Sequence, residues 1–299
     1  MRAGSAPKLF LDTNVCSTLL TAPYIQHYRE IMDAIDQRYR VVVSTETLIE
    51  MMDMLKGGNG EFFESDRKRI RLMAGTDVPV FLSSVGEYSL RTSLGIERPA
   101  KFQPVEFERW YEVITSATTR IQLFNEGVQW RKGRFIVNPD IIVEQQRAGK
   151  SSYRKWLKRY VTGRYTFPQQ EQWALNHARQ LGCELTPDEA LKLGTDMSAA
   201  YEFSKRNFAV ASAEGAFREN SRTREGDWVD GQQLMYLCDP TMHFLTGDRR
   251  IKSKCSASWQ CGRILLLSSF VSDLGIQISD TTSEDSTSDS YLGAGGAEV

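Results

Sequence analysis

The 299-residue chain has few features of a membrane or secreted protein. Its longest apolar stretch, residues 264–267 and their flanks, is far too short to cross a bilayer, and the N-terminus has no long apolar segment typical of a signal peptide. The five cysteines are odd in number and scattered, without a Cys-x-x-Cys pair. This distribution argues against disulfides and structural zinc and favours a reducing compartment. We therefore expect a cytoplasmic protein that has no membrane partner.

Basic residues are missing from the C-terminal end of the chain. Residues 279–299 carry five acids and no Lys or Arg, and they consist mainly of Ser, Thr, Asp and Gly. Such a segment buries too little apolar surface to offset its ordering entropy, so we predict a disordered acidic tail. Removing its five negative charges from the net charge of −1 leaves +4 for residues 1–278. A mildly basic body suits a polyanionic partner such as nucleic acid.

Short apolar runs alternate with amphipathic helical patterns, which predicts an α/β fold with a parallel sheet. Each run is compact and apolar, as expected for strands buried on both faces. The predicted strands are residues 9–11, 41–43, 78–82, 243–246 and 264–267. Residues 104–220 look almost entirely helical. We predict one domain over residues 1–278, with a core of about 8–75 and 224–275 and a large, mostly helical insertion of about 100–220.

Carboxylates stand at or near the ends of these predicted strands. Asp12 follows the first strand directly, and Asp248 follows the strand at 243–246. Glu50 lies in the helix after the second strand. Asp227 and Asp230 are three residues apart near a predicted helix start, hence on one face, although Asp227 can also serve as a favourable charge near the helix N-terminus. The carboxyl ends of parallel strands share one edge, where ligands bind.

Acids gathered at that edge repel one another unless a cation lies between them. Oxygen-only ligands suit Mg²⁺ or Mn²⁺, which can bind phosphate oxygens and lower the pKa of an attacking water. No Cys/His arrangement competes, because the three histidines are dispersed. The sequence therefore predicts a metal site that acts on a phosphate ester.

Four segments in order resemble a PIN domain, a nuclease fold. They are "LFLDTNV" at 9–15, "VVVSTETLIEMM" with Glu50, "DGQQLMYL" opening with Asp230, and "TGD" ending with Asp248. The resemblance covers roughly 8–74 and 224–274, and it does not cover the helical block. It implies an α/β/α sandwich and a metal-dependent nuclease, more often a ribonuclease. Asp12, Glu50, Asp230 and Asp248 would then be the catalytic and metal-binding residues, and cleavage would leave a 5′-phosphate.

Each candidate also has a simpler interpretation. Asp12 can be a helix cap, and Asp248 can be a turn aspartate or can support the metal ligands from behind. Glu50 can be a solvated helix residue, and Glu46, one turn earlier, lies on the same face. Asn14 can position Asp12, contact a nucleic-acid phosphate or cap a helix.

A basic and aromatic segment is the main candidate for contact with nucleic acid. Residues 147–167 carry seven basic residues and no acid, with Tyr153, Trp156, Tyr160 and Tyr165 interleaved. Basic groups contact phosphates, and aromatic rings stack on unpaired bases. The same spacing also fits a core stripe with a solvated basic face. The residues predicted to bind nucleic acid are Asn14, Arg154, Lys155, Lys158 and Arg159.

These patterns favour a metal-dependent nuclease that acts on RNA. The alternative is a non-catalytic nucleic-acid or protein-binding module that keeps the PIN-like fold. A third possibility is an acidic-site phosphohydrolase that acts on small phosphates. An inhibitor protein and a second copy of the chain are further candidate partners.

Overall fold

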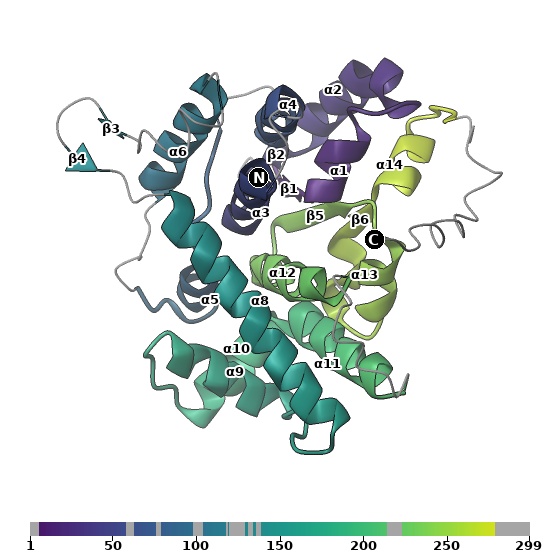
Figure 1. Ribbon diagram of the computed structural model, residues 1–299. Coiled ribbons are helices and arrows are strands. Elements are labelled where there is room, and N and C mark those ends of the chain that lie inside the picture. The colour runs from purple at the N-terminus through teal and green to yellow at the C-terminus, as the bar shows by residue number, and fades with distance from the viewer. Residues whose placement is uncertain are drawn as a thin grey trace, which may run out of the picture.

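A parallel sheet forms the centre of the molecule. The computed structural model describes residues 6–57, 63–75, 79–97, 104–117, 119, 129–130, 134–135, 139–213 and 223–278. In this part of the chain, the sheet has the order β2-β1-β5-β6. Its strands are β1 (Lys8–Leu11), β2 (Arg40–Val41), β5 (Met242–Thr246) and β6 (Ile264–Leu266). The predicted α/β class with a parallel sheet is confirmed (Figure 1).

The chain adds strands first on one side of β1 and then on the other. From β1 the chain moves outward to β2 and then to Phe81, which forms a parallel bridge with Val43. It returns on the other side of β1, where β5 and then β6 are added. A ligand site in an open α/β sheet lies outside the carboxyl ends of the strands at such a switch point. Here the switch point lies between β1 and β5.

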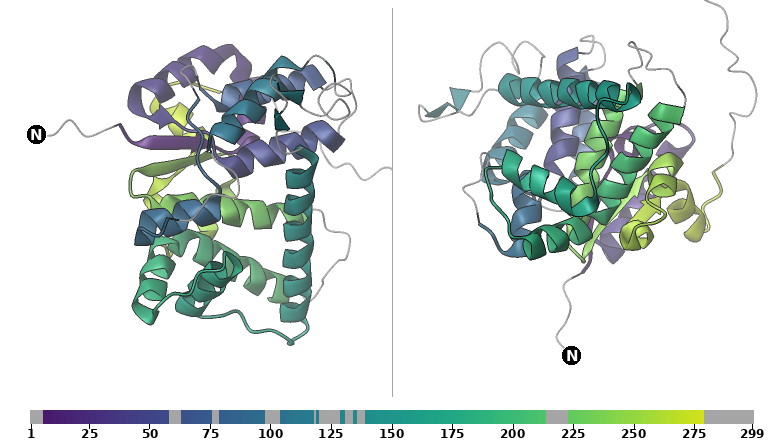
Figure 2. Two further views of the ribbon diagram at one scale, coloured as in Figure 1. Left: turned by 90° about the vertical axis from the view of Figure 1, so that its left-hand side faces the viewer. Right: turned by 90° about the horizontal axis from the view of Figure 1, so that it is seen from below.

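Helices cover both faces of the sheet (Figure 2). Side chains alternate along β1, so Leu9 and Leu11 join one core and Phe10 joins the other. The first core packs against α1 (Thr13–Thr18), α2 (Tyr28–Arg38), α3 (Thr45–Gly57), α4 (Phe63–Met73), α6 (Pro104–Ser116) and α14 (Leu267–Asp273). The second packs against α5 (Val85–Leu94), α9 (Gln170–Gln180), α10 (Pro187–Asp196), α11 (Ser198–Ala213), α12 (Thr223–Met235) and α13 (Arg249–Lys254).

Short elements complete the described chain. They are the 3₁₀ turns η1 (Tyr24–His27), η3 (Tyr236–Cys238) and η4 (Trp259–Arg263), and the antiparallel pair β3 (Gln129–Trp130) and β4 (Arg134–Phe135). The β3–β4 pair is a short exception within the segment predicted to be mostly helical, whose other described elements are helices. The predicted acidic tail, residues 279–299, lies outside the described residues. Within the described part, no helix is both long enough and apolar enough to span a membrane.

The long helix α8 (Pro139–Val161) lies on the side of the molecule where the strands end. In the left view of Figure 2, β1 runs from the N-terminal side toward the side on which α8 stands. α8 contacts α3 and α12 and, farther along, α11. Because α3 carries Glu50 and α12 carries Asp230, α8 borders the edge at which the sequence predicts a site.

Candidate functional site

The carboxylate of Asp12 joins the ends of β1 and β5. Its side chain does not make the capping hydrogen bond of α1, although its backbone carbonyl accepts from Cys16 N–H at 3.2 Å. Instead, Asp12 Oδ2 accepts hydrogen bonds from Asn14 Nδ2 and Thr246 Oγ1, both at 2.6 Å. The residue is 3% exposed. The helix-cap interpretation therefore holds for the backbone of Asp12 and does not explain its side chain.

The side-chain amide of Asn14 links Asp12 to Gly247. While its Nδ2 donates to Asp12, its Oδ1 accepts from Gly247 N–H at 2.8 Å. The approach is close, because a Cβ at Gly247 would lie 3.0 Å from Asn14 Oδ1. These contacts agree with a positioning role. The prediction that Asn14 contacts nucleic acid stays a prediction.

Two glutamates of α3 approach the site. Glu50 Oε2 accepts a hydrogen bond from Thr13 Oγ1 at 2.5 Å. Glu46, one turn earlier, is 8% exposed. Burial and the nearby charge of Glu50 raise the pKa of Glu46 to about 7. Glu46 is thus a buried carboxylate next to the predicted site, whereas the sequence indicates it only as a neighbour of Glu50.

The negative charges of the other candidate acids change the pKa of Asp230. Burial raises its pKa well above the usual range, and four negative charges raise it further: Asp12, Glu50, Asp227 and Asp248. These residues come from the β1–α1 junction, α3, α12 and the β5–α13 junction. Asp12 and Asp248 are 236 positions apart in the sequence and follow different strands. Both therefore lie at the switch point of the sheet.

The beginning of α12 differs from the prediction. The helix begins at Thr223, so Asp227 and Asp230 lie inside it and not at its start. A role for Asp227 as a charge at the helix N-terminus is therefore wrong. Its carboxylate instead lies 3.8 Å from Lys254 Nζ of α13.

Asp248 caps a helix and binds an arginine. Its Oδ1 accepts from Arg250 N–H at 2.7 Å, and the Arg250 guanidinium contacts both carboxylate oxygens, with the shortest distance 2.6 Å. Burial alone would raise the pKa of Asp248, but the hydrogen bonds from Arg250 outweigh it and leave the pKa below the usual value. This arrangement matches the turn-aspartate interpretation and a supporting role better than direct metal ligation.

The pKa of Asp12 is raised at this site. Burial raises it, the Thr246 hydrogen bond opposes the rise, and the charge of Glu50 adds to it, so that the pKa is about 7. Asp12 and Glu46 therefore titrate near neutral pH, and burial and the neighbouring acids raise the pKa of Asp230 as well. A cation at this position would remove the repulsion.

The donor chemistry fits a hard divalent cation, since every acid at the site offers carboxylate oxygens. The side chains as they stand do not yet form a ligand set: among the described residues, no group of three or more His, Cys, Asp or Glu is arranged to hold a metal ion. Three of the acids accept from separate donors, Asp12 from Thr246, Glu50 from Thr13 and Asp248 from Arg250. A shared ion would require Glu50 to exchange its Thr13 hydrogen bond.

Lys254 is a polar neighbour of the acids that was not predicted from the sequence. Besides its approach to Asp227, its Nζ donates to Asn207 Oδ1 of α11. Its charge also lowers the pKa of Asp248. No spacing in the sequence singles it out, because Lys254 reaches the acids only through the packing of α13 against α11.

Two buried glutamines were missed as well. Gln233 of α12 donates from Nε2 to Thr47 Oγ1 at 3.2 Å, and Thr47 donates to the carbonyl of Leu11, the residue before Asp12. Gln233 Oε1 and both amide atoms of Gln146, on α8, have no hydrogen-bond partner among the described residues. Buried amides normally find partners, in protein or in water, so these three atoms are exceptions.

The tyrosines of the basic segment belong to a core. Tyr153, Tyr160 and Tyr165 surround Phe208 of α11, with ring centroids 5.5, 5.3 and 6.3 Å away. The core-stripe interpretation is therefore correct for these three residues. Trp156 differs, because 44% of it is exposed.

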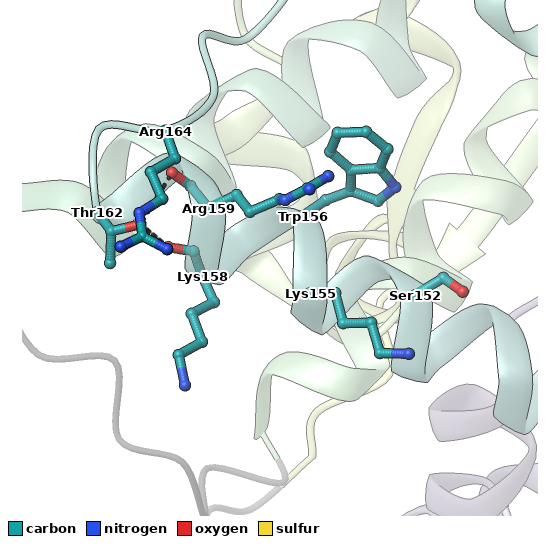
Figure 3. A pocket seen from close by; sticks show the side chains of 7 residues that line it. All are labelled: Ser152, Lys155, Trp156, Lys158, Arg159, Thr162 and Arg164. Carbon is teal, nitrogen blue, oxygen red and sulfur yellow. Dashed lines mark hydrogen bonds between the residues drawn. The ribbon is translucent and has the colours of Figure 1, made fainter.

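The cations of this segment surround a surface cavity of about 640 Å³ (Figure 3). Lys155, Lys158 and Arg159 line it, together with Arg164 from the turn after α8. Arg154, also predicted to bind nucleic acid, is not among its lining residues. The predicted contact with RNA stays a prediction.

None of the family models, curated proteins or solved structures with which the chain was compared matches it. The fold and site define a parallel α/β protein with buried acids at the switch point of its sheet. Its further assignment rests on the chemistry of these residues.

Proposed function

We propose that the protein is a PIN-like metal-dependent nuclease that hydrolyses phosphodiester bonds in RNA. One observation carries the proposal: acids from β1, α3 and α12 influence one another at the carboxyl end of the sheet's switch point. The charges of Asp12 and Glu50 raise the pKa of Asp230, and that of Glu50 raises the pKa of Asp12. Buried acids with raised pKa values in one place are typical of functional sites.

Asp12, Glu50 and Asp230 would hold Mg²⁺ or Mn²⁺, and Asp248 would support them from behind. The bound ion supplies positive charge to the phosphate and lowers the pKa of an attacking water. Thr246 and Asn14 fix the carboxylate of Asp12 in one orientation through its Oδ2.

Lys254 would bind the phosphate of the substrate near these acids. Asn207 and Asp227 hold its Nζ in position. A phosphate oxygen brought to this place would meet an ammonium group, and the product with a 5′-phosphate would keep that contact. Lys254 is therefore the substrate-binding cation of the proposal.

A binding module without catalysis is the second candidate, and one observation favours it. Asp12, Glu50 and Asp248 each accept a hydrogen bond from a nearby donor, and no three acids of the described residues are arranged to hold an ion. In this alternative the acids would be a structural network, and RNA or a protein would bind elsewhere on the surface.

RNA cleavage by matched variants separates the two candidates. The nuclease proposal predicts that wild-type protein cuts a single-stranded RNA with Mg²⁺ or Mn²⁺, that EDTA stops cleavage, and that Asp12→Asn and Asp230→Asn are inactive. Asp196→Asn is the control, because Asp196 pairs with Lys192 on α10, away from the site. Activity of Asp12→Asn equal to that of Asp196→Asn would exclude the nuclease.

A further inference from the structure

A groove of about 690 Å³ lies between α8, α9, α11 and α12. Its size is within the range of small-ligand pockets, roughly 300–1,000 Å³. The lining is rich in aromatic rings, including Trp156, Tyr165, Phe167, Trp173, Phe208 and Trp228. Between the rings are polar side chains such as Asn176, Arg179 and Gln232. The groove therefore combines an aromatic lining with hydrogen-bonding groups.

The basic cavity of Figure 3 adjoins this groove, because Ser152 and Trp156 line both. A helix C-cap brings Arg164 into it. α8 ends in a Schellman motif, in which Gly163 N–H bonds to Tyr160 O and Arg164 N–H bonds to Arg159 O at 2.8 Å. Gly163 adopts φ +70°, which glycine allows without strain. The turn thus places Arg164 beside the cations of the last turns of α8.

Trp156 stands between the two cavities. The guanidinium of Arg159 lies 5.3 Å from the centroid of its ring, and Tyr165 lies 4.9 Å away on the groove side. Other exposed large apolar residues exist among those described, but Trp156 is the one that lines a cavity with cations on one side and aromatic rings on the other. A ring in this position can stack on a base whose phosphate contacts the cations.

The far end of the groove reaches the helix that carries the acids. Asp227 and Trp228 line it, and Asp227 is three residues from Asp230 on the same helix. The Trp228 ring packs against α8 at Gly149, where an added Cβ would lie 2.5 Å from Trp228 Cζ2. The groove therefore runs from the basic end of α8 to the edge of the predicted catalytic site.

We propose that this groove binds unpaired bases of single-stranded RNA, with Trp156 as a stacking platform and the phosphates on Lys155, Lys158, Arg159 and Arg164. The complementarity of four cations to a polyanion, next to a wall of rings, identifies this occupant. The choice of RNA rests on the proposed function, while the groove itself is independent of the acids. The proposal assigns the substrate class as single-stranded, because a duplex keeps its bases stacked on each other.

The test is a binding titration of the full chain in EDTA, where metal-dependent cleavage cannot occur. Fluorescence anisotropy compares a labelled single-stranded RNA with an abasic oligonucleotide of equal length and charge. We expect wild type to bind the RNA more tightly. Trp156→Ala should weaken RNA binding by about 5- to 100-fold and leave abasic binding unchanged, as loss of base stacking does.

Trp259→Ala is the matched control, since Trp259 is 57% exposed and also has a guanidinium, that of Arg263, over its ring. Trp259 lines neither cavity, so its variant should bind RNA as wild type does. Equal binding of RNA and abasic oligonucleotide, or equal behaviour of the two tryptophan variants, would overturn the proposal and leave the groove to a protein partner. Tight binding through Trp156 without cleavage in Mg²⁺ would instead refute only the proposed nuclease.

Discussion

Replacing Asp12 by Asn should stabilise the protein in EDTA, and only at neutral to alkaline pH. The pKa of Asp12 is about 7 in the folded protein, against 3.8 for the free side chain, mainly because of burial. Between these two pH values the folded state binds more protons than the unfolded state. The free energy of unfolding therefore falls as the pH rises from about 4 to about 7, and the loss is complete above about pH 7.

The size of the effect follows from the same difference. Ionising Asp12 in the folded state costs up to about 4 kcal/mol, since each unit of pKa corresponds to about 1.4 kcal/mol. The Asp12→Asn variant would avoid this cost, but its amide would weaken the hydrogen bond from Thr246, worth about 1 to 2 kcal/mol. We expect a net gain of about 2 kcal/mol at about pH 8. At about pH 5 the raised pKa costs the wild type only about 1.6 kcal/mol, which the weakened hydrogen bond of the variant offsets, so the net gain should be about zero.

Urea denaturation in EDTA at these two pH values measures the effect. Asp196→Asn is again the control, because Asp196 forms an ion pair with Lys192 at 2.8 Å and should gain nothing at either pH. If the gain of Asp12→Asn were the same at both pH values, the raised pKa of Asp12 would be refuted. A loss of stability at about pH 8 would refute it as well.

Three further predictions test the surroundings of the site. Thr246→Val removes a hydrogen bond that lowers the pKa of Asp12, so the pH–rate profile of RNA cleavage should move to higher pH; an unmoved profile would contradict the role of Thr246. Gln146→Leu replaces a buried amide that has no partner among the described residues, so the free energy of unfolding should rise by about 1 kcal/mol, and a fall in urea titrations would indicate a bound group instead. Gly163→Val strains the left-handed turn after α8 and displaces Arg164, so RNA should bind more weakly by anisotropy, with a smaller salt dependence; unchanged binding would exclude Arg164 as a phosphate contact.

The sheet could be predicted because its strands are short, apolar and buried on both faces. Residues 9–11 and 243–246 lie in β1 and β5, as expected. The edge of the sheet differs from the prediction, because residues 78–82, predicted as a strand, contribute a single bridge at Phe81. The start of α12 was predicted too late, since the helix begins at Thr223. α12 continues through Gly226, and Trp228, two residues farther along, packs against Gly149 of α8.

The acids could be located from their places after strands, but their partners could not. The bond between Thr246 and Asp12 spans 234 positions, and its geometry depends on the pairing of β1 with β5. Lys254 and the buried state of Glu46 likewise arise from helix packing, which the local sequence does not encode. For the tyrosines of the basic segment, the sequence left two interpretations open. Their spacing fitted both a core and a surface, and Phe208, from a distant helix, decides for the core.

The most direct test of the proposed nuclease is a crystal structure of wild-type protein soaked in Mn²⁺, with anomalous scattering to locate the ion. We expect an Mn²⁺ ion about 2 Å from carboxylate oxygens of Asp12 and Asp230, with Glu50 turned away from Thr13 to join them. Crystals of Asp230→Asn, soaked in the same way, should show no ion there. A wild-type map with no ion among these acids, from crystals whose protein cuts RNA in solution, would contradict the account.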